Sequence, residues 1–141
     1  MDTTANIAVL IPCHNEQATI AKVVSDFRRE LPDARICVFD NDSTDGSADL
    51  AREGGAEVFY EPRLGKGHVI ELMLETIDAD LYVMVDGDDT YDASSVHALL
   101  EEVSAGRAAM CVGARVASES EAFRPMHVSG NWLVRKLVNR L

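Results

Sequence analysis

The chain has 141 residues, 13 basic and 24 acidic, which gives a formal net charge of −11 at pH 7. Its length suits one domain with a substantial core, and its acidic balance argues against nucleic-acid binding. The first residues lack the basic region typical of a signal peptide, and no apolar run reaches the length of a membrane span. The three cysteines form no CxxC pair, which favours reduced thiols in a cytoplasmic protein.

Strand-like and helix-like patterns alternate along the chain. The apolar run from Ile7 to Ile11 predicts a buried strand that Pro12 ends, and Asn15 is expected to cap the following helix. Further strands are predicted over 36–39, 58–60, 81–85 and 109–112, and helices over 20–31, 48–53, 65–77 and 96–103. Repeated βα units indicate a three-layer α/β/α fold around a mostly parallel sheet with right-handed crossovers.

The fourth predicted strand runs directly into an acidic segment. Four carboxylates lie between Asp86 and Asp92, and like charges this close repel one another unless a cation lies among them. Asp86 and Asp88 could face one ion, and Gly87 between them leaves room for a ligand. Mg²⁺ and Mn²⁺ are typically held by one or two carboxylates together with substrate phosphate and water. The segment therefore predicts a metal site, although a solvated acidic turn would have the same composition.

Polar clusters follow three of the predicted strands, at residues 12–16, 40–45 and 86–92. In open α/β sheets, ligands bind beyond the carboxyl ends of the strands. Because the three clusters are expected to lie at that same edge, they predict one binding site more strongly than an acidic turn does alone.

Four short motifs occur in order between residues 7 and 115: PCHNE at 12–16, VFDNDSTDG at 38–46, GKG at 65–67 and DGD at 86–88. Together they resemble the motifs of family 2 glycosyltransferases, and in particular those of the polyprenyl-phosphate (dolichol-phosphate) sugar synthases. The resemblance implies the Rossmann-like GT-A fold and transfer of a sugar from a nucleoside diphosphate sugar. It also implies that Mg²⁺ or Mn²⁺ bridges Asp88 and the diphosphate.

The resemblance assigns roles to individual side chains. His14 would stack on the base, and Glu16 would accept hydrogen bonds from the ribose. Lys66 and Arg115 would face phosphate. Asn41 replaces the second of the two adjacent aspartates usual in this turn, and an amide can offer the base either an acceptor or a donor. The implied nucleotide-sugar ligands are Pro12, His14, Glu16, Asp40, Asn41, Lys66, Asp86 and Arg115, and the implied metal ligands are Asp86 and Asp88.

The acceptor half of the reaction is expected from residues outside this sequence. The family's domain normally continues past this point, so we expect residues 1–141 to be the donor-binding part of a longer enzyme, with the catalytic base beyond Leu141. Residues 132–141 have the pattern of a basic amphipathic helix. Such a helix could lie at the cytoplasmic face of a membrane beside a lipid-phosphate acceptor, or pack on the rest of the domain.

Two alternative functions fit part of the same pattern. Residues 83–90 also match the Asp-x-Asp-x-Thr motif of haloacid dehalogenase-type phosphatases, with Asp86 as nucleophile and Asp88 as acid and base. That alternative leaves the first two polar clusters unexplained. The second is a non-catalytic interaction domain with a nucleotide-binding fold, because a fold does not by itself establish an activity.

Overall fold

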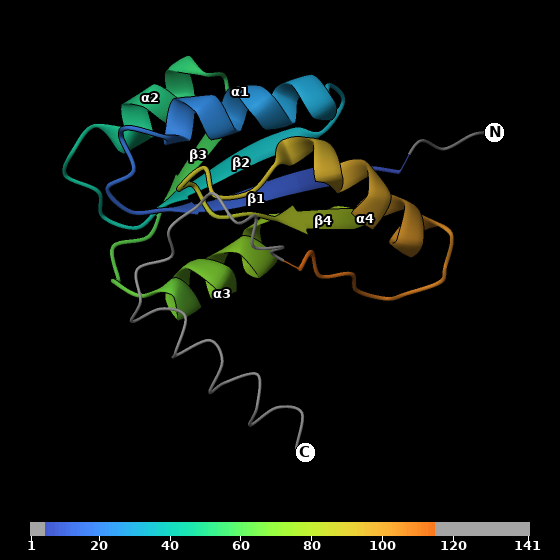
Figure 1. Cartoon of the computed structure of the whole chain (residues 1–141). Helices are drawn as coiled ribbons and strands as arrows, with labels where there is room; N and C mark the ends of the chain where they lie inside the picture. Colours follow the sequence, from blue (N-terminus) through green and yellow to red (C-terminus); the bar gives the residue numbers. More distant parts are fainter. Residues whose placement is uncertain (1–4, 115–141) are drawn as a thin grey trace, which may run out of the picture.

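The structure is a computed structural model that describes residues 5–114 (Figure 1). One sheet has the strand order β3-β2-β1-β4, and every neighbouring pair runs parallel. The parallel α/β fold expected from the sequence is confirmed. The strands are β1 (Ile7–Cys13), β2 (Arg35–Asp40), β3 (Glu57–Tyr60) and β4 (Leu81–Met84), and the helices are α1 (Ile20–Glu30), α2 (Ser47–Glu53), α3 (Lys66–Thr76), the short 3-10 helix η1 (Ala93–Ser95) and α4 (Val96–Ser104).

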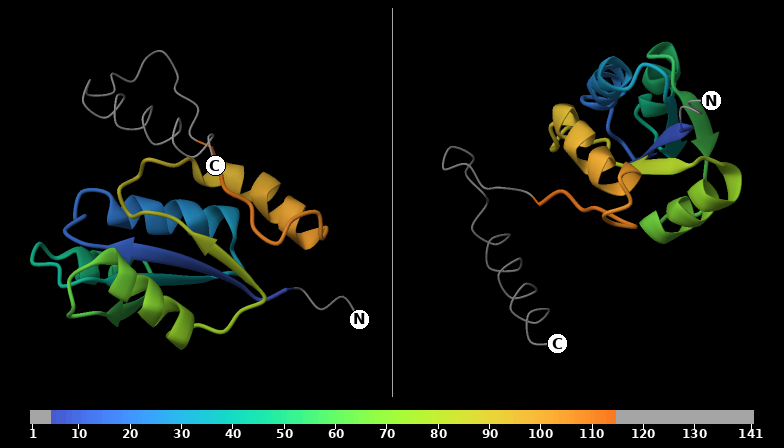
Figure 2. Two further views of the ribbon diagram at one scale, coloured as in Figure 1. Left: turned by 90° about the horizontal axis from the view of Figure 1, so that it is seen from below. Right: turned by 90° about the vertical axis from the view of Figure 1, so that its right-hand side faces the viewer.

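Helices cover both faces of the sheet. Helices α1, α2 and α4 lie on one face and α3 lies on the other (Figures 1 and 2). Along β1, Val9 and Ile11 belong to the core under α1, whereas Ala8 and Leu10 belong to the core against α3. Because both faces of this strand are covered, its sequence is a continuous apolar run and not an alternating one.

The prediction that Pro12 ends the first strand is wrong, because β1 continues to Cys13. The carbonyl of Cys13 accepts from the N–H of Asn41, which directly follows β2. The carbonyl of Leu10 accepts from the N–H of Val85, which directly follows β4. Alternate residues of a parallel strand face opposite neighbours, so Pro12 faces the β4 side. It lies beyond the last pair of β1 with β4, at Leu10 and Met84. A proline is tolerated there because no ladder hydrogen bond requires its missing N–H.

The predicted fifth strand over residues 109–112 is also wrong. This segment follows α4 as an irregular stretch, drawn in orange in Figure 1. Met110 and Val112 are 78% and 77% exposed, and within residues 5–114 no backbone hydrogen bond joins the segment to β4. An apolar run gains little by becoming a strand when its side chains are not buried and its backbone has no ladder partner.

Arg115 and the amphipathic pattern of residues 132–141 lie outside the described residues. Within the part of the chain that the structure describes, no helix combines the length and the apolar character needed to cross a membrane.

Candidate functional site

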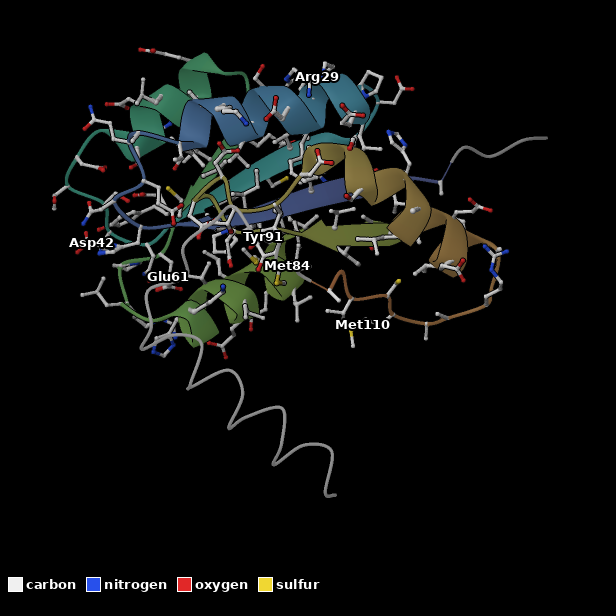
Figure 3. All side chains as sticks on the ribbon, in the orientation of Figure 1. Arg29, Asp42, Glu61, Met84, Tyr91 and Met110 are labelled. Carbon is white, nitrogen blue, oxygen red and sulfur yellow. The ribbon has the colours of Figure 1, made fainter. Side chains whose placement is uncertain are left out.

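Because all four strands are parallel, their carboxyl ends meet at one edge of the sheet. In Figure 3, Asp42 and Glu61 are labelled toward that end of the molecule, and Met110 toward the other end. A cleft of about 420 Å³ opens there, which we call the Lys66 cleft. Six of the eight predicted nucleotide-sugar ligands line it, namely Pro12, His14, Glu16, Asn41, Lys66 and Asp86. The geometry therefore brings together residues that the sequence separates by more than seventy positions.

A second cleft of about 470 Å³, the Asp88 cleft, lies at the start of α1 and is lined by Asp88, Asp45 and Glu16 among others. Glu16 lines both clefts. Asp86 and Asp88 were predicted to face one ion, but Asp86 lines the Lys66 cleft and Asp88 lines the Asp88 cleft. Their sharing of one ion stays a prediction.

Glu16 packs against the backbone of Gly87. A Cβ atom added to Gly87 would lie 2.1 Å from Oε2 of Glu16 and 3.2 Å from Cδ1 of Ile20. That Oε2 atom is buried and has no hydrogen-bond partner among the described residues. Burial, followed by the nearby charges of Asp88 and Asp86, raises the pKa of Glu16 to about 7. Gly87 therefore allows the carboxylate of Glu16 to pack against the backbone between Asp86 and Asp88.

The carboxylates around Gly87 fit a divalent cation. Its positive charge would offset their mutual repulsion and would give the unpaired oxygen of Glu16 a partner. No three His, Cys, Asp or Glu side chains within residues 5–114 converge tightly enough to hold a metal by themselves. An ion at this position would therefore require oxygen ligands from a substrate, which is how Mg²⁺ is usually bound beside phosphates.

Lys66 supplies the positive charge that faces this cluster. It is the first residue of α3 and forms an ion pair with Asp86. Its side chain is 58% exposed, so the ammonium group remains accessible from the cleft. A lysine at the N-terminus of a helix combines its own charge with the favourable end of the helix dipole, an arrangement suited to phosphate.

Asn15 joins two of the site loops and does not cap α1, contrary to the prediction. Helix α1 begins at Ile20, and its N-cap residue is Thr19. Asn15 has a left-handed backbone with φ of 53°. Its N–H donates to Oγ of Ser43 at 2.9 Å, and its Oδ1 accepts from the N–H of Thr44 at 2.8 Å. These reciprocal bonds hold the β1–α1 loop against the β2–α2 turn.

His14 is held in one tautomer. Its Nδ1 lies 2.6 Å from the backbone carbonyl oxygen of Asn41. Because a carbonyl only accepts, Nδ1 must carry the proton. The amide of Asn15 lies 3.3 Å from Nε2 and donates to it. The ring is thereby oriented along the wall of the Lys66 cleft, where stacking on a base was predicted.

Asp40 and Asn41, both predicted to contact the base or ribose, differ in the structure. Asp40 is 5% exposed and does not line the Lys66 cleft, and its Oδ1 is buried with no hydrogen-bond partner among residues 5–114. The side chain of Asn41 is 6% exposed and is bonded to the loop between β3 and α3. The amide of Asn41 is thus already occupied, whereas the carboxylate of Asp40 is not.

Thr19 and Lys22 hold the acidic segment against α1, and the sequence analysis missed both. Oγ1 of Thr19 donates to the carbonyl oxygen of Gly87 at 2.7 Å, and Nζ of Lys22 donates to Asp89 at 2.7 Å. Asp89 has a left-handed backbone with φ of 59°. The signal was available only as spacing, because Thr19 directly precedes the predicted helix and Lys22 follows Thr19 by three residues, close to one helical turn.

Glu61 is a buried carboxylate that the sequence analysis also missed. Its side chain is 3% exposed. The guanidinium of Arg63 donates to both of its carboxylate oxygens, at 2.9 and 2.8 Å, and the backbone N–H of Arg63 donates as well, at 2.9 Å. These bonds lower the pKa of Glu61 from its ordinary 4.5 to about 2.

The chain is expected to lose stability as the pH falls from about 4.5 to about 2, the ordinary and folded pKa values of Glu61. In that window the unfolded state binds a proton that the folded state does not, so the free energy of unfolding decreases with decreasing pH. Glu61→Gln should make this dependence shallower, as measured by urea unfolding across the window. Glu53→Gln, at the exposed end of α2, is the matched control. The same pH dependence in Glu61→Gln as in the wild type would contradict this assignment.

Comparisons with known proteins agree with the geometry. A family model described as glycosyl transferase family 2 matches residues 8–140. Protein RfbJ of Shigella flexneri is 52% identical over 110 residues, which are 78% of this chain and 85% of RfbJ. Glycosyltransferase AglJ of Haloferax volcanii is 38% identical over 107 residues, which are 75% of this chain and 35% of AglJ. A dolichyl-phosphate hexose transferase of the same archaeon is 28% identical over 142 residues, which are 99% of this chain and 60% of that protein.

A solved structure shows the same fold. Glucosyl-3-phosphoglycerate synthase from Mycobacterium tuberculosis, in complex with Mn²⁺, UDP-glucose and phosphoglyceric acid, superposes with a TM-score of 0.64 at 27% identity. The match covers 71% of this chain and 39% of that one. The expected GT-A fold is thereby confirmed. The chain spans well under two thirds of this synthase and of AglJ.

Proposed function

Because the chain belongs to glycosyltransferase family 2, we propose that the carboxyl edge of its sheet binds a nucleoside diphosphate sugar for transfer to an acceptor. The observation that carries this proposal is the group of carboxylates around Gly87, in which Glu16 has an unpaired buried oxygen. Lys66 faces the same group across the cleft. Such a site has both the anionic groups for a metal ion and the cation for a diphosphate.

Asp86 and Asp88 would hold Mg²⁺ or Mn²⁺ together with the diphosphate, as the complex of the mycobacterial synthase with Mn²⁺ and UDP-glucose suggests. When bound, the ion would stabilise the negative charge that develops on the departing diphosphate. Lys66 would donate to a phosphate oxygen from the N-terminus of α3. Thr19 and Lys22 hold the acidic segment against α1, and so would keep the proposed metal ligands in place.

The nucleoside would lie along the wall formed by Pro12 and His14. The Nδ1 proton of His14 is committed to the carbonyl of Asn41, so the ring is held in a single orientation for stacking. Glu16 would accept hydrogen bonds from the ribose hydroxyls. Contact of Asp40 with the base or ribose stays a prediction, because its buried carboxylate does not line the Lys66 cleft. A phosphate contact by Arg115 stays a prediction.

For the acceptor, we propose a polyprenyl phosphate at the cytoplasmic face of a membrane. The similarity to a dolichyl-phosphate hexose transferase and the basic, apolar pattern of residues 132–141 support this class. A lipid phosphate is already ionised, so it requires less help from a base than a hydroxyl does. The catalytic base expected beyond Leu141 stays a prediction.

Calorimetry with UDP, GDP, CDP and ADP, with and without Mn²⁺, tests the donor site. We expect one of these diphosphates to bind in a metal-dependent manner. Asp88→Ala should weaken that binding by about 10- to 100-fold, the loss expected when a charged contact worth roughly 1.5–3 kcal/mol is removed. Asp33→Ala, an exposed carboxylate between α1 and β2 at the opposite edge of the sheet, is the matched control and should bind like the wild type.

The same experiment decides between the alternatives. Absence of binding to every diphosphate, in a wild-type sample shown to be folded by circular dichroism, would overturn the donor-site proposal and favour a non-catalytic interaction domain. The phosphatase alternative is disfavoured, because the family match over residues 8–140 includes all four motifs, whereas the phosphatase motif covers only residues 83–90.

A further inference from the structure

The side chain of Asn41 connects the sheet to the loop between β3 and α3, residues 61–65. Its Nδ2 donates to the backbone carbonyls of Glu61 and Arg63, each at 2.9 Å, and its Oδ1 accepts from the N–H of Gly65 at 2.9 Å. Both N–H donors of a single amide, and one acceptor site of its oxygen, are thus engaged by one loop. Only 6% of the residue is exposed, so these bonds have little competition from water.

Asn41 is itself anchored through its backbone. Its N–H donates to the carbonyl of Cys13 in β1 at 2.8 Å, and its own carbonyl accepts from His14. The start of the loop has a second attachment, because the N–H of Glu61 donates to the backbone carbonyl of Asp40 at 2.9 Å. The later backbone groups, at Arg63 and Gly65, are attached to the sheet through the Asn41 side chain. Gly65 is followed directly by Lys66.

We propose that Asn41 is a positioning residue that holds the β3–α3 loop so that Lys66 faces Asp86 across the cleft. It acts through Lys66, and both N–H donors of its side chain are engaged by the loop. The proposal concerns the arrangement of the free protein, and it rests on the proposed function only where it predicts nucleotide binding. It also gives a reason for an amide at a position where the resemblance leads us to expect an aspartate.

An aspartate at position 41 could not make the same contacts. A carboxylate has nearly the same shape as the amide, but it would place an anionic oxygen where Nδ2 now faces two carbonyl oxygens. Acceptors facing acceptors repel, and the buried charge would lack a donor on that side. Asn41→Asp therefore changes the hydrogen-bonding pattern with little change in volume, whereas Asn41→Ala removes the pattern altogether.

Amide hydrogen exchange measured by NMR on the free, full chain tests the proposal without any ligand. In the wild type, the N–H of Gly65 should be protected. In both Asn41 variants its protection should fall by about tenfold or more, because at least the two hydrogen bonds from the amide to the loop carbonyls are lost. Amides of β1 and β2 should keep their protection. Asn6→Asp makes the same chemical change at the opposite end of β1 and should leave Gly65 protected.

Uniform loss of protection throughout the chain would overturn the proposal, because it would show a general stabilising role. Unchanged protection of Gly65 in Asn41→Asp would also overturn it. A double-mutant cycle then tests the link to Lys66 with the diphosphate that binds best: Asn41→Asp should weaken binding about tenfold in the wild type but have little effect in Lys66→Ala. Equal effects in both backgrounds would overturn that link. If no diphosphate binds, the proposed function fails while the exchange result still decides the role of Asn41.

Discussion

Gly87→Ala is expected to weaken metal-dependent nucleotide binding while the chain remains folded. The new Cβ would lie 2.1 Å from Oε2 of Glu16, closer than two such atoms can approach, so Glu16 must move. Because Oε2 is the end of a flexible side chain, Glu16 can rotate away at little cost to stability, but it then leaves its position beside the acidic segment. The backbone of Gly87 is not left-handed, so the effect comes from the close approach alone.

Calorimetry with the bound diphosphate and Mn²⁺, beside a thermal unfolding curve, would measure this effect. Affinity should fall at least as far as in Asp88→Ala. Gly113→Ala is a suitable control, because a Cβ there would make an ordinary contact with Leu99 at 3.6 Å. Wild-type affinity in Gly87→Ala would show that the approach of Glu16 to the acidic segment has no part in binding.

Phe39→Ala should produce the largest loss of stability. Phe39 is fully buried in β2 and stacks on Phe59 with ring centroids 4.9 Å apart. It lies in the core between the sheet and α3, together with Leu10 of β1 and Met73 of α3. Truncation of a buried phenylalanine costs about 3–5 kcal/mol, which is a large share of the roughly 5–15 kcal/mol typical of a whole domain.

Urea unfolding followed by circular dichroism would determine this loss. Leu74→Ala, on the solvent side of α3 and 62% exposed, should change the free energy of unfolding by less than about 0.5 kcal/mol. A comparable change in both variants would mean that the face of the sheet under α3 is not a packed core.

The parallel fold could be predicted from the sequence because a strand that is buried on both faces consists of consecutive apolar residues. Residues 7–11 are apolar without interruption since two layers of helices cover them. Residues 109–112 show that an apolar run is not sufficient to predict a strand. They are equally apolar, but burial depends on a neighbouring element, which a local pattern does not specify.

The positions of the site loops could be predicted, but the bonds within them could not. Parallel topology brings the ends of the strands together whatever their side chains, so the polar clusters could be located. The bonds from Asn41 to the β3–α3 loop and from Thr19 to Gly87 join residues 20 to 68 positions apart. No periodicity relates such distant residues. Asn41 was consequently expected to contact the base, although its side chain is bonded to the loop.

The position of Glu16 between the two clefts has a thermodynamic consequence. Because its pKa is raised to about 7, this carboxyl can gain or lose a proton near neutral pH, so a ligand that favours one protonation state in one cleft changes the free energy of binding in the other. Such coupling is reciprocal by necessity: whatever factor the first ligand imposes on the second, the second imposes on the first. Metal and nucleotide should therefore bind cooperatively even where they share no direct contact, and Glu16→Gln should reduce that cooperativity.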